Sequence, residues 1–175
     1  AKSTKQGRIN RPDYALFADD ATKDAAYPLQ GDDDAFYGQT LAIAEAKYWG
    51  RALSKQDAGG RDAWKKDNNP SYQMVTYLVG TRCAWGILTN GKVWRLYSRE
   101  VSSTASEYYE VDLDAIMASP QPGGTEGGAV VDNRLAAFKR WLLFFRRAAF
   151  TPDSQGHSFV QRVHAGSATY AKEVS

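Results

Sequence analysis

Residues 83–97 read CAWGILTNGKVWRLY, and the Asn-Gly pair at positions 90 and 91 separates two runs of strand-forming residues. Asn-Gly accepts the positive backbone angles of a tight hairpin turn, so this pattern is the strongest short-range signal for a β-hairpin. The stretch predicts two antiparallel strands joined by a short turn.

The segment before the hairpin carries the signals of a helix. Asn68 or Asn69 followed by Pro70 is typical of a helix cap and first turn. We expect the helix to run from Pro70 to about Arg82. Its apolar face is formed by Met74, Tyr77 and Leu78.

Three other stretches predict strands. The apolar run from Tyr14 to Ala18 suits a buried strand, and 108–113 alternates between polar and apolar residues. Residues 41–47, LAIAEAK, are apolar as far as Glu45, as expected of a central strand covered on both faces. The polar segments between them, at 31–34 and 54–70, are interpreted as a turn and a glycine-containing loop.

The last third of the chain predicts two helices after a connector. Residues 119–128, SPQPGGTEGG, are rich in glycine and proline and indicate a flexible connection. Asp132 or Asn133 can cap a helix that runs to about Phe150, and a final helix is expected from about Ser158. Spacings of three and four residues link Leu135, Phe138, Leu142 and Phe145.

This order of elements predicts an α/β fold with a mixed central sheet flanked by helices. We divide the chain into a core at 1–118, the flexible connector at 119–128 and a helical extension at 129–175. The 175 residues are enough for one domain with its own core. A net charge of +2 excludes the uniformly cationic surface of a histone-like protein.

The cysteine and hydropathy patterns indicate a cytoplasmic protein without a membrane span. Cys83 is the single cysteine, so no internal disulfide forms, and no Cys/His cluster has zinc spacing. Its apolar neighbours suggest a packed side chain rather than a nucleophile. Because the chain opens on Ala1 instead of Met, we expect it to be a domain of a longer protein.

Three charged residues stand where the pattern favours apolar ones. Asp13 begins a predicted strand, while Glu45 and Lys47 end another and share one side of it. If these strands are neighbours, the two carboxylates and the carbonyl of Ala46 can form the hard oxygen site that Mg²⁺ prefers. The alternative is an ordinary Glu/Lys pair at a strand end beside an unrelated Asp.

The order of motifs resembles the PD-(D/E)xK nuclease superfamily. RPDYALF at 11–17 contains the PD element, and LAIAEAKYWGRAL at 41–53 contains the ExK element. QMVTY at 73–77 matches the QxxxY element of many such nucleases, and the hairpin follows it. The likeness spans about residues 8–175 and is greatest to the amino-terminal nuclease domains of type IIG and type I-like restriction-modification proteins. It implies a restriction-endonuclease-like sheet.

The resemblance implies a metal-dependent DNA endonuclease. Asp13, Glu45 and the Ala46 carbonyl would bind Mg²⁺, for which Mn²⁺ can substitute, and Lys47 would be the catalytic lysine. Gln73 and Tyr77, four residues apart on one helix face, would border the active site. Such nucleases often carry a glutamate on a helix before the first core strand, and this chain starts too close to Asp13 to contain that whole helix.

Contacts with double-stranded DNA are expected from a few basic residues. These are Arg51, Arg61, Lys65 and Lys66. The resemblance also implies methyltransferase and target-recognition domains as partners, reached through the helices at the C-terminal end, and a transient dimer on DNA for double-strand cutting.

Two other functions remain open from the sequence. A nuclease fold that no longer cuts would serve as a DNA-binding or interdomain scaffold. A glycosidase would also use two carboxylates, but it gives Lys47 no clear role.

Overall fold

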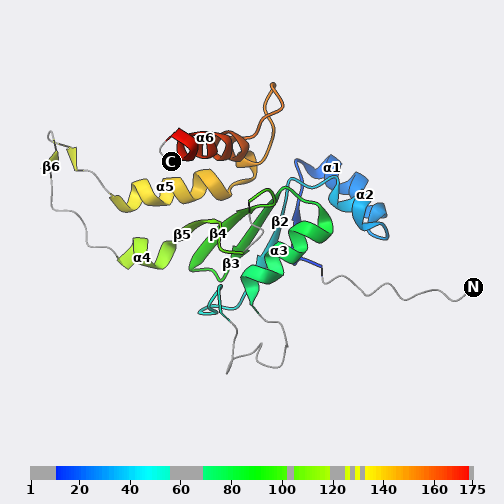
Figure 1. The fold of residues 1–175 in the computed structure, drawn as a ribbon, viewed down its shortest axis with the longest axis horizontal. Helices are drawn as coiled ribbons and strands as arrows, with labels where there is room; N and C mark the ends of the chain where they lie inside the picture. The colour runs from blue at the N-terminus through cyan, green and yellow to red at the C-terminus, as the bar shows by residue number, and fades with distance from the viewer. Residues whose placement is uncertain are drawn as a thin grey trace, which may run out of the picture.

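A five-stranded mixed sheet lies at the centre of the protein (Figure 1). The computed structural model describes residues 11–55, 69–101, 105–118, 125–126, 129–130 and 133–173. The strands, in spatial order, are β1 (Tyr14–Leu16), β2 (Ala42–Ala46), β3 (Trp85–Thr89), β4 (Val93–Ser98) and β5 (Tyr109–Asp112). β2 and β3 are parallel, and the other neighbouring pairs are antiparallel. The predicted α/β class, with a mixed sheet flanked by helices, is confirmed.

The two β2 neighbours explain why its sequence is almost continuously apolar. Ala42 and Ile43 are completely buried, because β2 has a strand on each side and helices over both faces. β1 is different, since Tyr14 is 60% exposed. The strand predicted at 14–18 is present, but it has only three residues and lies at the edge of the sheet, so the prediction that it is buried is wrong.

The predicted hairpin is confirmed as β3 and β4. Trp85 is paired with Ser98 and Thr89 with Trp94. Gly91 has a φ of +86°, which a residue with a side chain adopts only with strain. The predicted strand at 108–113 is also present as β5.

A parallel pair requires the chain to cross over between its strands, and α3 (Pro70–Thr81) makes this connection. Asn69 caps it by accepting a hydrogen bond from the Ser71 amide at 3.1 Å, as the sequence predicts. Met74 packs on Gly86, where an added Cβ would lie 2.4 Å from the methionine Sδ. The core on this face of the sheet is formed by Tyr37, Ile43, Leu53, Met74, Tyr77, Leu78, Cys83, Leu88 and Tyr97.

Two short helices follow β1, in a region for which only a turn at 31–34 was predicted. They are α1 (Asp20–Ala26) and α2 (Asp33–Tyr37), with the 3-10 turn η1 (Tyr27–Leu29) between them. Asp19 accepts from the Thr22 amide at 2.7 Å, and Asp32 from the Ala35 amide at 3.1 Å. Both aspartates are helix caps, and the segment predicted as a turn at 31–34 contains the start of α2.

The helices near the C-terminal end cover the second face of the sheet (Figure 1). They are α5 (Asn133–Phe145), the 3-10 turn η3 (Arg147–Ala149) and α6 (Phe159–Glu173). This core contains Ala42, Trp85, Ile87, Leu96, Val111, Phe145, Ala149, Phe150 and Val160. The predicted helical extension thus packs on the same sheet as the predicted core.

The apolar residues spaced three and four apart in α5 do not form the side of the helix that is buried. Leu135, Phe138 and Leu142 are each more than 40% exposed, whereas Phe145 is buried. The helix also ends at Phe145, earlier than predicted, because the chain changes to the η3 turn. Trp141 and Phe144 instead pack against the sheet.

The connector region is described only in part. α4 (Leu113–Ala118) was not predicted, and residues 119–124 and 127–128 lie outside the described ranges. β6 (Thr125–Glu126) and β7 (Ala129–Val130) form a separate antiparallel pair. No helix in the described ranges has the length and apolar character needed to cross a membrane.

Candidate active site

The pairing of β1 with β2 brings Asp13 and Glu45 together. Tyr14 is opposite Ala44, so Asp13 immediately precedes the paired strand at the position facing Glu45. The Asp13 amide donates to Glu45 Oε2 at 3.2 Å, and Asp13 Oδ2 accepts from the Ala46 amide at 2.9 Å. The two carboxylates therefore meet at the same strand end, as expected if these strands were neighbours.

A chain of polar contacts continues from Glu45 to α3. Lys47 Nζ donates to Glu45 Oε1 at 2.6 Å and to Gln73 Oε1 at 2.7 Å. Gln73 Nε2 then donates to the Tyr77 hydroxyl at 2.6 Å. The period of the helix puts Gln73 and Tyr77 on one side, and the period of the strand puts Glu45 and Lys47 beneath them.

The charged groups at this site are largely removed from water. Side-chain exposure is 6% for Glu45 and 9% for Lys47. Burial raises the pKa of the Glu45 carboxyl, and the nearby charge of Asp13 adds to this rise. Lys47 opposes the rise through its hydrogen bond and its positive charge.

Tyr77 is a neutral hydrogen-bonding group at the back of the site. Burial, followed by the charge of Glu45, raises the pKa of Tyr77 to about 12. The phenol therefore keeps its proton at neutral pH. Because it accepts from Gln73, it fixes the amide with its oxygen toward Lys47.

The donor atoms near Asp13 suit a hard divalent cation. Asp13 and Ala46 are exposed, so solvent reaches this end of the strand pair although Glu45 itself is buried. The Ala46 amide points to Asp13, and in an extended strand the carbonyl of the same residue points the same way. Within the described ranges no three His, Cys, Asp or Glu side chains gather as a metal cluster. Two carboxylates and one carbonyl would leave several coordination positions to water, which is usual for Mg²⁺.

The predicted DNA contacts are placed differently. Arg51 is only 2% exposed, and its Nη1 donates to the carbonyls of Ala52 and Lys55 at 2.6 and 2.7 Å. The expectation that Arg51 reaches a phosphate is therefore wrong, because its guanidinium holds the loop after β2. Arg61, Lys65 and Lys66 lie outside the described residues.

The loop after β2 also contains an exposed tryptophan that the sequence motifs did not indicate. Trp49, two residues after Lys47, is 66% exposed and rests against the hairpin turn at Gly91. Its sequence signal is the aromatic pair Tyr48-Trp49 followed by Gly50, directly after the ExK element.

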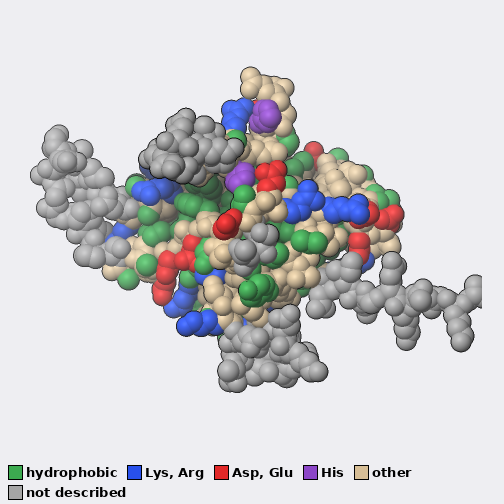
Figure 2. Space-filling model, in the orientation of Figure 1, with side chains coloured by type: hydrophobic (Ala, Val, Ile, Leu, Met, Phe, Trp, Pro, Cys, Tyr) green, Lys and Arg blue, Asp and Glu red, His purple; other side chains and the backbone are tan. Residues whose placement is uncertain are grey.

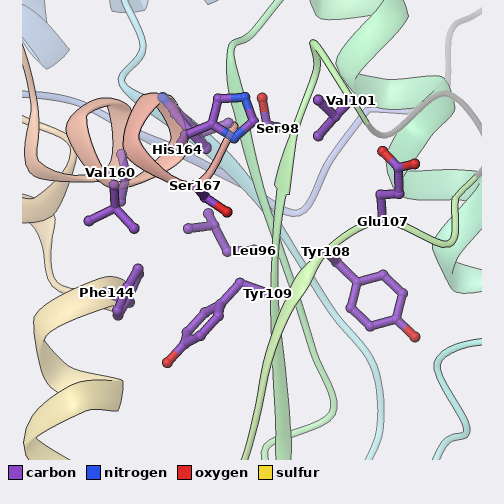
Figure 3. A pocket seen from close by; sticks show the side chains of 12 residues that line it. Leu96, Ser98, Val101, Glu107, Tyr108, Tyr109, Phe144, Val160, His164 and Ser167 are labelled. Atoms are coloured by element: carbon purple, nitrogen blue, oxygen red, sulfur yellow. The ribbon is translucent and has the colours of Figure 1, made fainter. Parts of the chain in front are cut away.

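Two adjoining hollows, of about 350 and 590 Å³, lie on the face of the sheet away from α3. Figure 3 shows that Leu96 and Tyr109 from the sheet and Phe144 and Val160 from the helices surround the smaller one. His164, which lines both, has its Nε2 3.5 Å from Glu100 Oε2. By size alone, these hollows would be the first candidates for a binding site. The buried contacts of Lys47 with Glu45 and Gln73, however, lie on the face of the sheet that α3 covers. We therefore place the candidate chemistry at Glu45 and Lys47.

Comparisons of the chain with protein-family models, with curated proteins and with solved structures find no match. The contacts that join Asp13, Glu45, Lys47 and Gln73 are the basis of the functional proposal.

Proposed function

We propose that the protein is a Mg²⁺-dependent DNA endonuclease domain of the PD-(D/E)xK type. The observation that carries this proposal is the position of Lys47, held between Glu45 and the Gln73 amide, with Asp13 at the same strand end. Phosphodiester hydrolysis requires a cation beside the phosphate and a positioned water, and these side chains can provide both.

Each residue would have a distinct role. Asp13, Glu45 and the Ala46 carbonyl would hold Mg²⁺, which polarises the phosphate and lowers the pKa of a bound water. Lys47 would orient the attacking water and balance negative charge on the phosphate. The water oxygen would form a bond to phosphorus while the bond to the leaving oxygen breaks; the water would release its proton to solvent, and the leaving oxygen would take up a proton from solvent. Gln73, which is held by Tyr77, would keep the Lys47 ammonium in position beside the phosphate.

The contact between Lys47 and Glu45 would change when a cation binds. Glu45 Oε1 accepts from Lys47, so a cation that takes this oxygen must share or replace the ammonium. Lys47 would remain in place because Gln73 Oε1 accepts from it at 2.7 Å. The amide therefore gives Lys47 a second anchor that does not depend on the carboxylate.

The charge of the surface fits a domain that cuts DNA held by other parts of a larger protein. On the face shown in Figure 2, basic and acidic side chains are interspersed, and the net charge is only +2. Nonspecific DNA affinity depends on the number of phosphates that basic groups neutralise. We propose a restriction-modification or phage-defence protein as the parent, with methyltransferase and target-recognition domains that supply sequence recognition.

The test is nicking of supercoiled plasmid with Mg²⁺ by the wild-type chain, Lys47→Met and Asp13→Asn. Exposed residues of α1 supply the matched controls Lys23→Met and Asp24→Asn. We expect the two site variants to lose about 100-fold or more of the rate, and the controls to keep it.

A second measurement separates metal binding from cleavage. Mg²⁺ should raise the melting temperature of the wild type and should not raise that of Asp13→Asn, because a bound ligand stabilises the folded state. Equal nicking by the wild type and Lys47→Met, or no nicking by either, would overturn the proposed activity. Metal stabilisation without nicking would favour the noncatalytic scaffold.

A further inference from the structure

The loop that follows β2 is fastened to the hairpin turn at two points. The Lys47 amide donates to the Thr89 carbonyl at 2.7 Å, and Asn90 Nδ2 donates to the Arg51 carbonyl at 2.8 Å. The buried Arg51 guanidinium closes the loop from inside. The segment between these two points, which includes Trp49, is therefore held close to the catalytic lysine.

Trp49 presents its indole in a defined position. The ring atoms Cε3 and Cζ3 lie against Gly91, where an added Cβ would be 2.8 and 2.9 Å from them. Lys92 Nζ is 5.1 Å from the ring centroid and also forms an ion pair with Asp114 at 2.8 Å. A cation at this distance from an indole face is attracted to it.

The indole adds little to the core of the protein. It is 66% exposed and belongs to neither of the two core clusters. A single exposed aromatic residue is common on protein surfaces. This one, however, is braced by a glycine and a cation, and it lies two residues from Lys47 at the end of the sheet that holds the proposed site.

We propose that Trp49 is a stacking platform for an unpaired nucleobase of DNA next to the cleaved phosphate. This inference rests on the proposed function and adds the class of substrate. Stacking on an aromatic ring tolerates any base, but it requires a base that is not enclosed in a continuous duplex. The preferred substrates would be single strands, forks and frayed ends. Lys92 would lie beside the adjoining phosphate.

The experiment compares Trp49→Leu with Trp49→Phe. Leucine keeps an apolar side chain but removes the aromatic face, whereas phenylalanine retains a face for stacking. Phe138→Leu is the control, because Phe138 is also exposed, at 44%, and lies on α5 over the other face of the sheet. Fluorescence anisotropy would measure binding of a labelled 20-nucleotide thymidine strand and of a 20-base-pair duplex, in EDTA and at constant salt.

We expect the wild type to bind the single strand more tightly than the duplex. Trp49→Leu should weaken single-strand binding about 30-fold, the middle of the range for loss of one stacked base. Trp49→Phe and Phe138→Leu should remain within about threefold of the wild type, and duplex binding should be unchanged in all three variants.

The outcomes separate this inference from the proposed function. Unchanged single-strand binding by Trp49→Leu, or no preference of the wild type for the single strand, would overturn the role of Trp49 even if Mg²⁺-dependent nicking is present. Conversely, loss of single-strand binding in Trp49→Leu, in a chain that never nicks DNA, would support the stacking role and refute the endonuclease.

Discussion

Replacing Lys47 by methionine tests the buried charge pair directly. Methionine keeps much of the length and apolar volume of the lysine stem but removes the ammonium. Glu45 would then retain the Asp13 amide as a donor, while its contact with Lys47 at 2.6 Å would be lost. Because both side chains are less than 10% exposed, solvent would replace the missing contact poorly.

The expected loss of stability depends on pH. The pKa of Glu45 is already raised by burial, and removing Lys47 raises it further because both lowering effects of the ammonium disappear. A carboxyl with a folded pKa above its unfolded pKa binds more protons in the native state, so the free energy of unfolding falls as pH rises between these two values. Each pH unit between the two pKa values lowers the free energy of unfolding by about 1.4 kcal/mol. The additional loss of stability between pH 5 and pH 8 is therefore at most about 4 kcal/mol. We expect Lys47→Met to be less stable than the wild type by about 2–4 kcal/mol at pH 8 and by less than about 1 kcal/mol at pH 5.

Urea unfolding followed by circular dichroism from pH 5 to pH 8 would measure this dependence. Lys23→Met removes an exposed lysine from α1 and should follow the wild type at every pH. The double variant Lys47→Met with Glu45→Gln should lose most of the extra pH dependence, because no carboxyl remains to titrate. An equal loss of stability at every pH in Lys47→Met would refute the argument, since Glu45 would then not be the group that responds.

Three other predictions concern packing, metal binding and helix capping. Gly86→Ala should destabilise the fold by about 1–3 kcal/mol, because the new Cβ would lie 2.4 Å from Met74 Sδ; an unchanged urea midpoint would contradict this. Nicking should require more Mg²⁺ as the pH is lowered, because protons compete with the cation for the Glu45 carboxylate. Since the pKa of Glu45 is raised, this effect should begin at a higher pH than for an ordinary glutamate. A Mg²⁺ titration at several pH values measures it, and an affinity that does not vary with pH would rule it out. Ser158→Ala should lower stability by about 1 kcal/mol in thermal unfolding, because Ser158 and Gln161 form reciprocal hydrogen bonds at the start of α6; full retention of stability would show that this cap is dispensable.

Local sequence signals determined several elements of this fold. The Asn-Gly turn at 90–91, the cap at Asn69 with Pro70, and the apolar run at 41–44 all act through backbone geometry or through the burial of adjacent residues. For that reason the hairpin, α3 and β2 could be predicted without knowledge of the rest of the chain. The spacing of Glu45 from Lys47 likewise put both side chains on one side of a strand.

Other features depended on which elements became neighbours. The two short helices after β1 were not predicted, because an aspartate such as Asp32 is equally suited to a turn and to a helix cap. Arg51 reads as a surface cation in the sequence, yet the loop folds around its guanidinium and buries it. The spacing of apolar residues in α5 likewise did not show which side of that helix meets the sheet.

The candidate site shows the same division. From the sequence alone, Asp13 and Glu45 are separated by 32 residues, and their meeting could only be stated as a condition. Tertiary structure brought them together by pairing β1 with β2, and it placed α3 so that Gln73 reaches Lys47. Local periodicity sets the direction of a side chain, whereas the distance between two elements is set by the burial of the whole sheet between its helix layers. The residue types were therefore determined by the sequence, and their convergence was decided by the packing of the fold.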